Sequence, residues 1–217
     1  MIYDVRTYNL KPGAAEEYAE GVKGRLPIRQ KLSPLGGYWY TVIGPLNQAV
    51  NIWPYKDVDY YVDFRTRYDP VKAWGPMHED GVNNWNYQFI DKVHNEVMFP
   101  APFMKPLGER RIGPIYDMRI DTHAPGDIPK TLEAWGKVIE EREKLSPLAG
   151  FWHSDINGLN LQCSGRIIHL WAYKTFEDRT RIQAESHKRG YWLPPGSALP
   201  TKSENKIMLP YDFSPMQ

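Results

Sequence analysis

The sequence contains one cysteine, carries almost no net charge and has no long apolar run. Because Cys163 has no second cysteine to pair with, an intramolecular disulfide is excluded, and a reducing cytoplasm is the expected location. The formal net charge of +1 makes nucleic acid and anionic membranes unexpected partners, since both attract strongly basic proteins. No segment reaches the roughly 18–20 apolar residues that span a bilayer. The first residues form a strand pattern rather than a targeting leader.

What the chain does contain is an internal repeat. Residues 32–39 (LSPLGGYW) and 145–152 (LSPLAGFW) match at six of eight positions, and their starts lie 113 residues apart in a chain of 217. At the same offset, residues 2–6 (IYDVR) match residues 115–119 (IYDMR). Such self-similarity indicates a duplicated unit of about half the chain.

Each unit is predicted to have six elements in the order strand, helix, strand, strand, helix, strand. In the first unit, the hydrophobic periodicities place these elements at 2–10, 14–32, 38–43, 49–55, 57–73 and 89–99. Pro27 is expected to kink or divide the first helix. This order is the ferredoxin-like arrangement. The predicted fold class is therefore α+β, with tandem ferredoxin-like units at residues 1–108 and 109–217.

The landmarks of the repeat resemble the NIPSNAP family. They are the Tyr-Asp-x-Arg strand, the Pro-Gly turn, the Leu-x-Pro-Leu-x-Gly-x-Trp segment, the Gly-x-Leu-Asn hairpin, the Trp-x-Tyr strand and the Phe-Ser-Pro at 213–215. Ser33 and Ser146 depart from the family pattern, in which glycine is common. The resemblance implies a dimeric α/β barrel, in which two four-stranded antiparallel sheets face each other with helices outside. Because both halves lie on one chain, we expect an intramolecular barrel, and a homodimer of such barrels is a plausible assembly.

Three tryptophan pairs occupy corresponding positions in the two units: Trp39 and Trp152, Trp53 and Trp171, and Trp74 and Trp192. Core packing accounts for them, because large aromatic side chains dominate the energetics of cores. The alternative is an aromatic-walled pocket for a flat apolar ligand. In barrels of this fold the ligand usually lies between a sheet and its two helices. The first two pairs are therefore our candidate substrate-binding tryptophans.

Arg6 and Arg119 each lie two residues after an acid, Asp4 or Asp117, so arginine and acid share a strand face. An unpaired buried charge is costly. One interpretation is therefore a structural ion pair across the pseudo-twofold axis. The other is an anchor for a substrate carboxylate or enolate, which a guanidinium binds in bidentate fashion. The second interpretation makes both arginines candidate substrate-binding residues.

None of the six histidines has a histidine at the corresponding position of the other unit. Duplicated units often diverge when one of them retains a function, and histidine is the side chain best suited to proton transfer near neutral pH. His153 falls on Tyr40, and Asp155 is predicted to share the strand face of His153. His169 lies on the adjoining strand, so these three side chains could meet. Such a set suits a divalent metal, but no metal-binding motif accompanies it, and no metal is predicted.

Two further histidines join His153 as candidate catalytic residues. His187, near the end of the second helix of the second unit, corresponds by position to the iron-ligating histidine of haem-degrading relatives of this fold. His78 lies in a polar loop (GPMHEDG, residues 75–81) of the kind that often covers a site. A solvent-exposed position without function is the alternative for both.

Three functions remain open. The favoured prediction is a cofactor-independent enzyme of oxygenase, isomerase or lyase type. It would act on a small hydrophobic or aromatic compound, with a histidine as acid or base and an arginine holding an anionic oxygen. The alternatives are a haem or tetrapyrrole binder and a non-enzymatic binding or scaffold protein. No phosphate-binding loop or nucleophile elbow appears, which disfavours nucleotide use and acyl transfer. The enzymatic function requires an enclosed cavity beside His153, His187 or His78.

Overall fold

The computed structural model describes residues 1–67, 88–154 and 164–217, which form two units. The first contains β1 (Ile2–Leu10), α1 (Ala15–Arg29), β2 (Gly37–Ile43), β3 (Gln48–Tyr55), α2 (Val58–Arg67) and β4 (Ile90–Pro100). The second contains β5 (Ile115–His123), α4 (Ile128–Glu143), β6 (Leu148–His153), β7 (Gly165–Tyr173), α5 (Phe176–Lys188) and β8 (Lys202–Pro210). His78, Trp74 and Asp155 lie outside the described residues.

The eight strands close into one barrel in the order β1-β3-β2-β8-β5-β7-β6-β4, and all neighbours are antiparallel. Within the units the strand orders are β4-β1-β3-β2 and β8-β5-β7-β6, which is the ferredoxin-like order. Two seams join the units: β2 pairs with β8 through four residue pairs, and β4 pairs with β6 through two. The predicted fold class and the closure of the barrel within one chain are confirmed.

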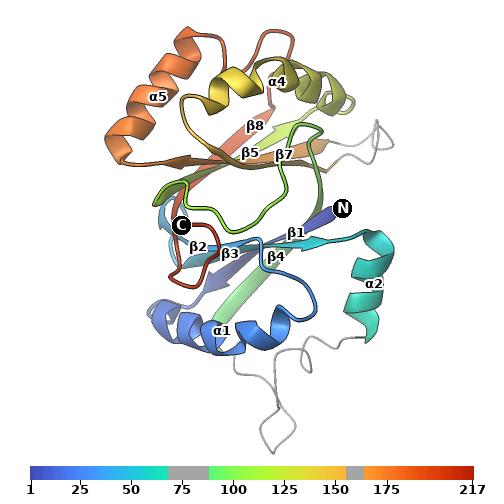
Figure 1. Cartoon of the computed structure of the whole chain (residues 1–217), viewed down its shortest axis with the longest axis vertical. Helices are drawn as coiled ribbons and strands as arrows, with labels where there is room; N and C mark the ends of the chain where they lie inside the picture. The colour runs from blue at the N-terminus through green and yellow to red at the C-terminus, as the bar shows by residue number, and fades with distance from the viewer. Residues whose placement is uncertain (68–87, 155–163) are drawn as a thin grey trace, which may run out of the picture.

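Figure 1 shows four layers, with the two sheets in the middle and helices on both outer faces. Helices α1 and α2 cover the sheet of the first unit, and α4 and α5 cover the sheet of the second. Three apolar clusters fill the spaces between these layers. In the described part of the chain, no helix is both long enough and apolar enough to cross a membrane.

Along each strand, side chains point alternately into the barrel interior and toward the helices, because successive residues of a strand point to opposite faces. On β1, Tyr3 and Val5 enter the cluster between the two sheets, whereas Ile2 and Leu10 pack toward the helices. The equivalent strand β5 follows the same rule, with Met118 inside the barrel. Charged residues at the intervening positions of β1 and β5 therefore face the helices rather than the barrel interior.

The repeated Gly-x-Trp segment is explained by the packing of each tryptophan on its own strand. Trp39 and Trp152 are fully buried between the sheets. Each indole folds back over the glycine two residues earlier, so that a Cβ on Gly37 or Gly150 would lie only 2.0 or 2.1 Å from Cη2 of the ring. The tryptophan therefore requires the glycine, and the repeat preserves the pair as a packing unit.

Pro27 does not divide the first helix. Helix α1 continues through Pro27 and ends at Arg29, three residues before the predicted end. Proline lacks a backbone N–H, but in the last turn of a helix it removes only one hydrogen bond close to the natural end. The predicted division of the helix is wrong for this reason.

Candidate functional site

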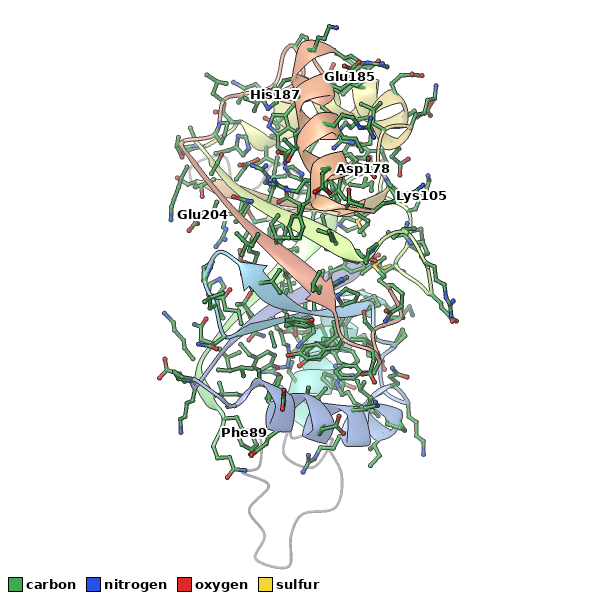
Figure 2. All side chains as sticks on the ribbon, turned by 90° about the vertical axis from the view of Figure 1, so that its left-hand side faces the viewer. Phe89, Lys105, Asp178, Glu185, His187 and Glu204 are labelled. Carbon is green, nitrogen blue, oxygen red and sulfur yellow. The ribbon has the colours of Figure 1, made fainter. Side chains whose placement is uncertain are left out.

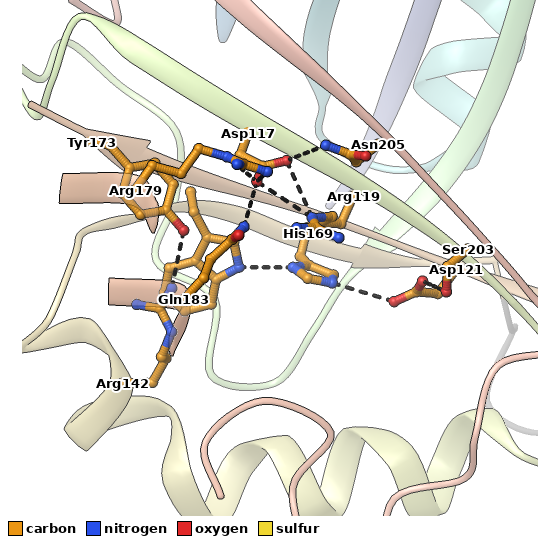
Figure 3. Close-up of polar contacts among 11 residues, drawn as sticks. Asp117, Arg119, Asp121, Arg142, His169, Tyr173, Arg179, Gln183, Ser203 and Asn205 are labelled. Atoms are coloured by element: carbon orange, nitrogen blue, oxygen red, sulfur yellow. Dashed lines mark hydrogen bonds and ion pairs between the residues drawn. The ribbon is translucent and has the colours of Figure 1, made fainter. Parts of the chain in front are cut away.

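The strongest candidate site lies between the sheet of the second unit and helices α4 and α5. Asp117, Arg119 and Asp121 of β5 and His169 and Trp171 of β7 all point toward these helices, because they alternate with side chains of the barrel interior. Arg119 lies directly opposite His169 in the β5–β7 ladder. Figure 3 shows the polar side chains of this layer converging from β5, β7, β8 and α5.

His169 is buried and uses both ring nitrogens within the site. It is 1% exposed. Trp171 donates its indole N–H to Nδ1 of His169 at 2.7 Å, and Nε2 lies 3.4 Å from Oδ2 of Asp121. Because Nδ1 accepts a hydrogen bond, the neutral ring carries its proton on Nε2, directed at the carboxylate. Trp171 thus fixes the tautomer and leaves Nε2 as the nitrogen available for chemistry.

Asp121 is held as a carboxylate at this position. Its Oδ1 accepts a hydrogen bond of 2.6 Å from the hydroxyl of Ser203 on β8. Burial acts to raise the pKa of Asp121, but the contacts with His169 and Ser203 lower it, and the resulting pKa lies below the usual aspartate value. The pair therefore places a carboxylate beside an imidazole N–H.

An enclosed cavity of about 10 Å³ adjoins the His169–Asp121 pair. Its volume suits one water molecule. His123, which is 2% exposed, also lines the cavity, and its Nδ1 has no hydrogen-bond partner within the described residues. Burial lowers the pKa of His123, against the opposing effect of the Asp121 and Asp127 carboxylates. The cavity thus combines a charged oxygen with two buried imidazoles.

Trp192 forms the cover of the cavity. Its ring centroid lies 5.4 Å from that of His169, and the guanidinium carbon of Arg119 lies 5.0 Å from the indole centroid. The next residue, Leu193, has a φ of 51°, in the left-handed region that leucine rarely adopts. The covering segment after α5 is thus held in a strained backbone conformation directly above the histidine.

Asp117 is the centre of a second polar cluster in the same layer. The carboxylate is 1% exposed and lies 3.2 Å from Nε of Arg119 and 2.7 Å from Nη2 of Arg179. The amide of Gln183 donates to it at 2.9 Å, and that of Asn205 at 3.4 Å. Two arginines and two amides thus saturate one buried carboxylate, which fixes Arg119 beside Trp192.

Substituting Asp117 by asparagine is expected to lower the free energy of unfolding by about 2 kcal/mol, because Arg119 and Arg179 lose their common counter-ion. The value is below that of a fully buried pair, since both guanidiniums keep some contact with water. Urea unfolding measures the change. The control is Lys137→Gln, which breaks an exposed pair with Glu133 and should have almost no effect. Equal effects of the two substitutions would contradict a structural role for the Asp117 cluster.

A buried arginine stacks on the tryptophan of each Trp-x-Tyr strand. The guanidinium of Arg142 lies 4.0 Å above the ring of Trp171 and donates to the hydroxyls of Ser146 and Tyr173. Arg29 makes the equivalent stacking contact in the first unit. Burial lowers the pKa of Arg142, partly offset by Tyr173. The hydrogen bond from Arg142 gives the serine of the repeated Ser-Pro segment a structural role in the second unit.

The two units differ at the residue that accepts the indole hydrogen bond. In the first unit, Trp53 donates to Oδ1 of Asn51 at 2.8 Å. His169 occupies the corresponding position in the second unit, since Asn51 and His169 lie opposite Arg6 and Arg119 in equivalent ladders. The acceptor of the indole N–H is therefore a side-chain amide in the first unit and an imidazole in the second.

The predicted arginine and tryptophan candidates fall into separate layers. Arg6 and Arg119 pair with Asp4 and Asp117 of their own strands, so the predicted ion pair across the pseudo-twofold axis is wrong. The reason is that these positions face the helices of separate units. Trp53 and Trp171 lie in the sheet–helix layers. Trp39 and Trp152 lie between the sheets, away from the layer in which a ligand was expected.

The predicted catalytic histidines do not assemble with His169. His153 is half-buried at the end of β6, where its ring lies 6.1 Å from that of Phe99, and it does not line the cavity of His169. His187 is exposed near the end of α5, as Figure 2 shows. Its ring contacts the covering Trp192 at 6.0 Å. His78 and Asp155 lie outside the described residues.

The surroundings of His187 do not fit a haem group. An axial histidine must face a space of macrocycle size, whereas His187 is exposed on α5 and the enclosed space beside Trp192 measures about 10 Å³. No group of three or more potential metal ligands occurs among the described histidine, cysteine and acidic residues. We therefore derive no chemistry from haem.

Three residues of the site were not named as candidates from the sequence: Asp121, His123 and Arg142. Trp192 was noted only as the counterpart of Trp74 in the repeat. The first two continue the alternation of β5 beyond Arg119, which was the available signal. Arg142 repeats Arg29 at the offset of 113, but the repetition gave no indication of its stacking. His169 was considered with His153 and Asp155, whereas its actual carboxylate partner comes from the neighbouring central strand.

The fold and the site define an α/β barrel of two ferredoxin-like units on one chain, with a buried polar site beneath the helices of the second unit. The solved structure of a putative monooxygenase from Lactobacillus acidophilus NCFM has the same fold: it is 11% identical, with a TM-score of 0.62, over 96% of this chain and 92% of that one. The NIPSNAP family model matches residues 3–105 and 116–215. The chain belongs to the NIPSNAP family.

Curated relatives extend over the same region. A NipSnap homologue of Dictyostelium discoideum is 26% identical over 203 residues, which cover 88% of this chain and 78% of that protein. NipSnap homolog 2 of Mus musculus is 28% identical over 241 residues, covering all of this chain and 76% of the relative. These similarities place both units within the family.

Proposed function

We propose that this protein is a cofactor-independent enzyme of isomerase or lyase type, which acts on a small hydrophobic or aromatic carbonyl compound at the site of the second unit. The carrying observation is the buried His169–Asp121 pair beside an enclosed cavity, with Nδ1 of His169 occupied by Trp171. This bond directs the proton of the imidazole toward the cavity side of the ring. The first unit has Asn51 instead and lacks such a group.

The chemistry supported by this geometry is enolisation. Asp121, whose lowered pKa keeps it ionised, accepts a proton from the carbon next to the carbonyl group of the ligand. His169 donates its Nε2 proton to the carbonyl oxygen and becomes an imidazolate, to which the indole N–H of Trp171 continues to donate, while the ligand becomes a neutral enol. Asp121 then returns its proton to a different carbon of the enol while the imidazolate takes back the hydroxyl proton, which completes an isomerisation and restores both side chains. Arg119, fixed by Asp117, stabilises negative charge that develops on the oxygen.

Ligand binding in this proposal requires Trp192 to move. The cavity admits about one water molecule, and the indole of Trp192 occupies the space above His169 and Trp135. A flat aromatic ligand would replace the indole against the same rings and the Arg119 guanidinium. The positive φ of Leu193 supports this movement, because a strained conformation loses part of its stability when the covering segment opens.

The test follows a proton on carbon. The probe is β-tetralone, a bicyclic aromatic ketone, and the measurement is deuterium incorporation next to its carbonyl group in deuterated buffer, followed by NMR. We expect the protein to accelerate the exchange, and His169→Asn to lower the acceleration by about 100-fold. Asparagine is the informative replacement because Asn51 accepts the equivalent indole bond in the first unit. Binding of the probe, read from tryptophan fluorescence, should persist in the variant.

The matched control is Asn51→Ala, which alters the first unit and should leave the exchange rate unchanged. If the wild-type protein binds β-tetralone without accelerating exchange, it is a binding protein and the enzymatic proposal fails. If His169→Asn exchanges deuterium as fast as the wild type, another group transfers the proton. If the probe does not bind, the proposed ligand class is wrong.

The open edge of β4 supports the proposal of a homodimer. Residues 90–98 of β4 pair only with β1 among the described strands, and Val93 and Val97 on this strand are exposed. An unpaired strand edge with apolar side chains is a natural surface for a second copy of the chain.

A further inference from the structure

A second cluster of charged side chains lies at one end of the barrel interior, apart from the proposed enzymatic site. Lys206 of β8, Gln48 of β3, Glu96 of β4 and Arg166 of β7 each lie two residues before a member of the interior cluster, so all four face inward. The other end of the interior is filled by apolar residues that include Met216. The cluster therefore lines one end of the barrel only.

These four residues form two bridges, one across each seam between the units. Arg166 pairs with Glu96 at 3.1 Å beside the β4–β6 seam, and Lys206 donates to Oε1 of Gln48 at 2.8 Å beside the β2–β8 seam. The two bridges occupy equivalent positions in the repeat. Gln48 corresponds to Arg166, because they lie opposite Asn9 and Thr122 in equivalent ladders. Glu96 likewise corresponds to Lys206, because they lie opposite Val5 and Met118. One seam thus has a complete ion pair, and the other has a lysine bound to a neutral amide.

Lys206 is the most buried member of the cluster. It is 7% exposed, whereas Gln48, Glu96 and Arg166 are half-buried. Burial, with a smaller contribution from Arg166, lowers the pKa of Lys206 to about 8 against the opposing effects of Glu204 and Glu96. About a tenth of the amine is therefore neutral and nucleophilic at pH 7.

Figure 2 shows where this strand lies: β8 begins at the side of the molecule, where Glu204 is labelled, and crosses toward the first unit. Glu204 is exposed and pairs with Lys202. The end of the barrel next to Lys206 thus adjoins solvent through exposed and half-buried polar side chains. Nε of Arg166 is buried without a partner among the described residues, which leaves one donor of this cluster unused.

We propose that Lys206 forms a Schiff base with a small carbonyl compound that carries a carboxylate, such as a 2-oxo acid. The Nζ lone pair attacks the carbonyl carbon, and loss of one water molecule gives the imine. The Arg166–Glu96 bridge has no net charge, whereas the Lys206–Gln48 bridge has the positive charge of a lysine without a counter-ion. The carboxylate of the bound compound would balance this charge. Nothing in this site uses His169 or Asp121, so it is a function separate from the enolisation proposed above.

The experiment treats the folded, full-length protein with glyoxylate and sodium cyanoborohydride near pH 7. The reagent reduces the imine and leaves a carboxymethyl group, which peptide mass spectrometry locates. Lys206 is expected to react about 100-fold faster than the exposed Lys202 of the same strand, because the lowered pKa of Lys206 leaves more of its amine unprotonated. Acetaldehyde serves as the uncharged probe and should give a smaller ratio of Lys206 to Lys202 labelling.

Two substitutions of Gln48 separate this proposal from simple accessibility. Gln48→Glu places a carboxylate beside Lys206, as in the other seam, and should reduce its labelling by at least about tenfold because the amine becomes protonated. Gln48→Met removes the amide without adding charge and should preserve the labelling. Equal labelling of Lys206 and Lys202, or no effect of Gln48→Glu, would overturn the nucleophilic lysine. Equal ratios with glyoxylate and acetaldehyde would overturn the preference for a carboxylate.

Discussion

Gly150→Ala is expected to lower the free energy of unfolding by about 3 kcal/mol or more, one of the largest effects of any single methyl group in this protein. The added Cβ would lie 2.1 Å from Cη2 of Trp152, and the ring is fully buried between the two sheets. The indole is enclosed by the apolar cluster between the sheets, so it cannot move without disturbing neighbouring side chains. Urea unfolding followed by far-ultraviolet circular dichroism measures the change.

Two further variants test the cause of this effect. Gly136→Ala in α4 is the control, because its Cβ would meet Phe103 at an ordinary 3.6 Å and alanine favours a helix. It should be neutral or slightly stabilising. In a Trp152→Leu background, Gly150→Ala should cost much less, since the clashing ring is absent. If the cost of Gly150→Ala stays the same in that background, the Gly-x-Trp explanation is wrong.

Lys206→Met is expected to raise the free energy of unfolding by about 2 kcal/mol near pH 7 and to flatten its dependence on pH. The pKa of Lys206 is about 8 in the folded protein and about 10.5 in the unfolded chain. Between these values the unfolded state binds more protons, so the stability of the wild type rises with pH. A difference of about 2.5 units corresponds to about 3 kcal/mol, reduced here by the lost bond to Gln48.

The measurement compares urea unfolding of wild type and variant from about pH 7 to pH 9.5. Over this interval the wild type should gain about 2 kcal/mol more than the variant. Higher pH is avoided because burial raises the pKa of tyrosines such as Tyr55, to about 12, and the unfolded state then loses protons first, which removes stability. Lys202→Met, at an exposed position of the same strand, is the control. Parallel curves for wild type and Lys206→Met would contradict the lowered pKa.

Much of the fold was predictable because it depends on local patterns. The alternation of residues 2–10 indicated a strand with two distinct faces, and the separate clusters around Tyr3 and Ile2 confirm it. The family resemblance implied a barrel, and the duplication placed both of its halves on one chain. Pro27 shows the limit of a local rule: whether a proline breaks a helix depends on how near the natural end it lies.

The site was less predictable because its contacts depend on distant strands. Periodicity correctly placed Arg119 and Asp117 on one face, but only the packing of α5 brings Arg179 and Gln183 onto the same carboxylate. Asp121 approaches His169 because β5 and β7 are neighbours, whereas sequence proximity had suggested Asp155. The bonding role of Trp171 depends on side-chain conformations that no periodicity encodes.

Closure of the barrel within a single chain has a thermodynamic consequence. In a barrel of two separate subunits, the seams form by association, so the barrel comes apart on dilution. Here the β2–β8 and β4–β6 seams join parts of one molecule, and dilution cannot separate them. Each mutation also alters one seam rather than two. The Arg166–Glu96 and Lys206–Gln48 bridges show what this permits: a charge excess on one side of a barrel whose architecture remains almost twofold symmetric.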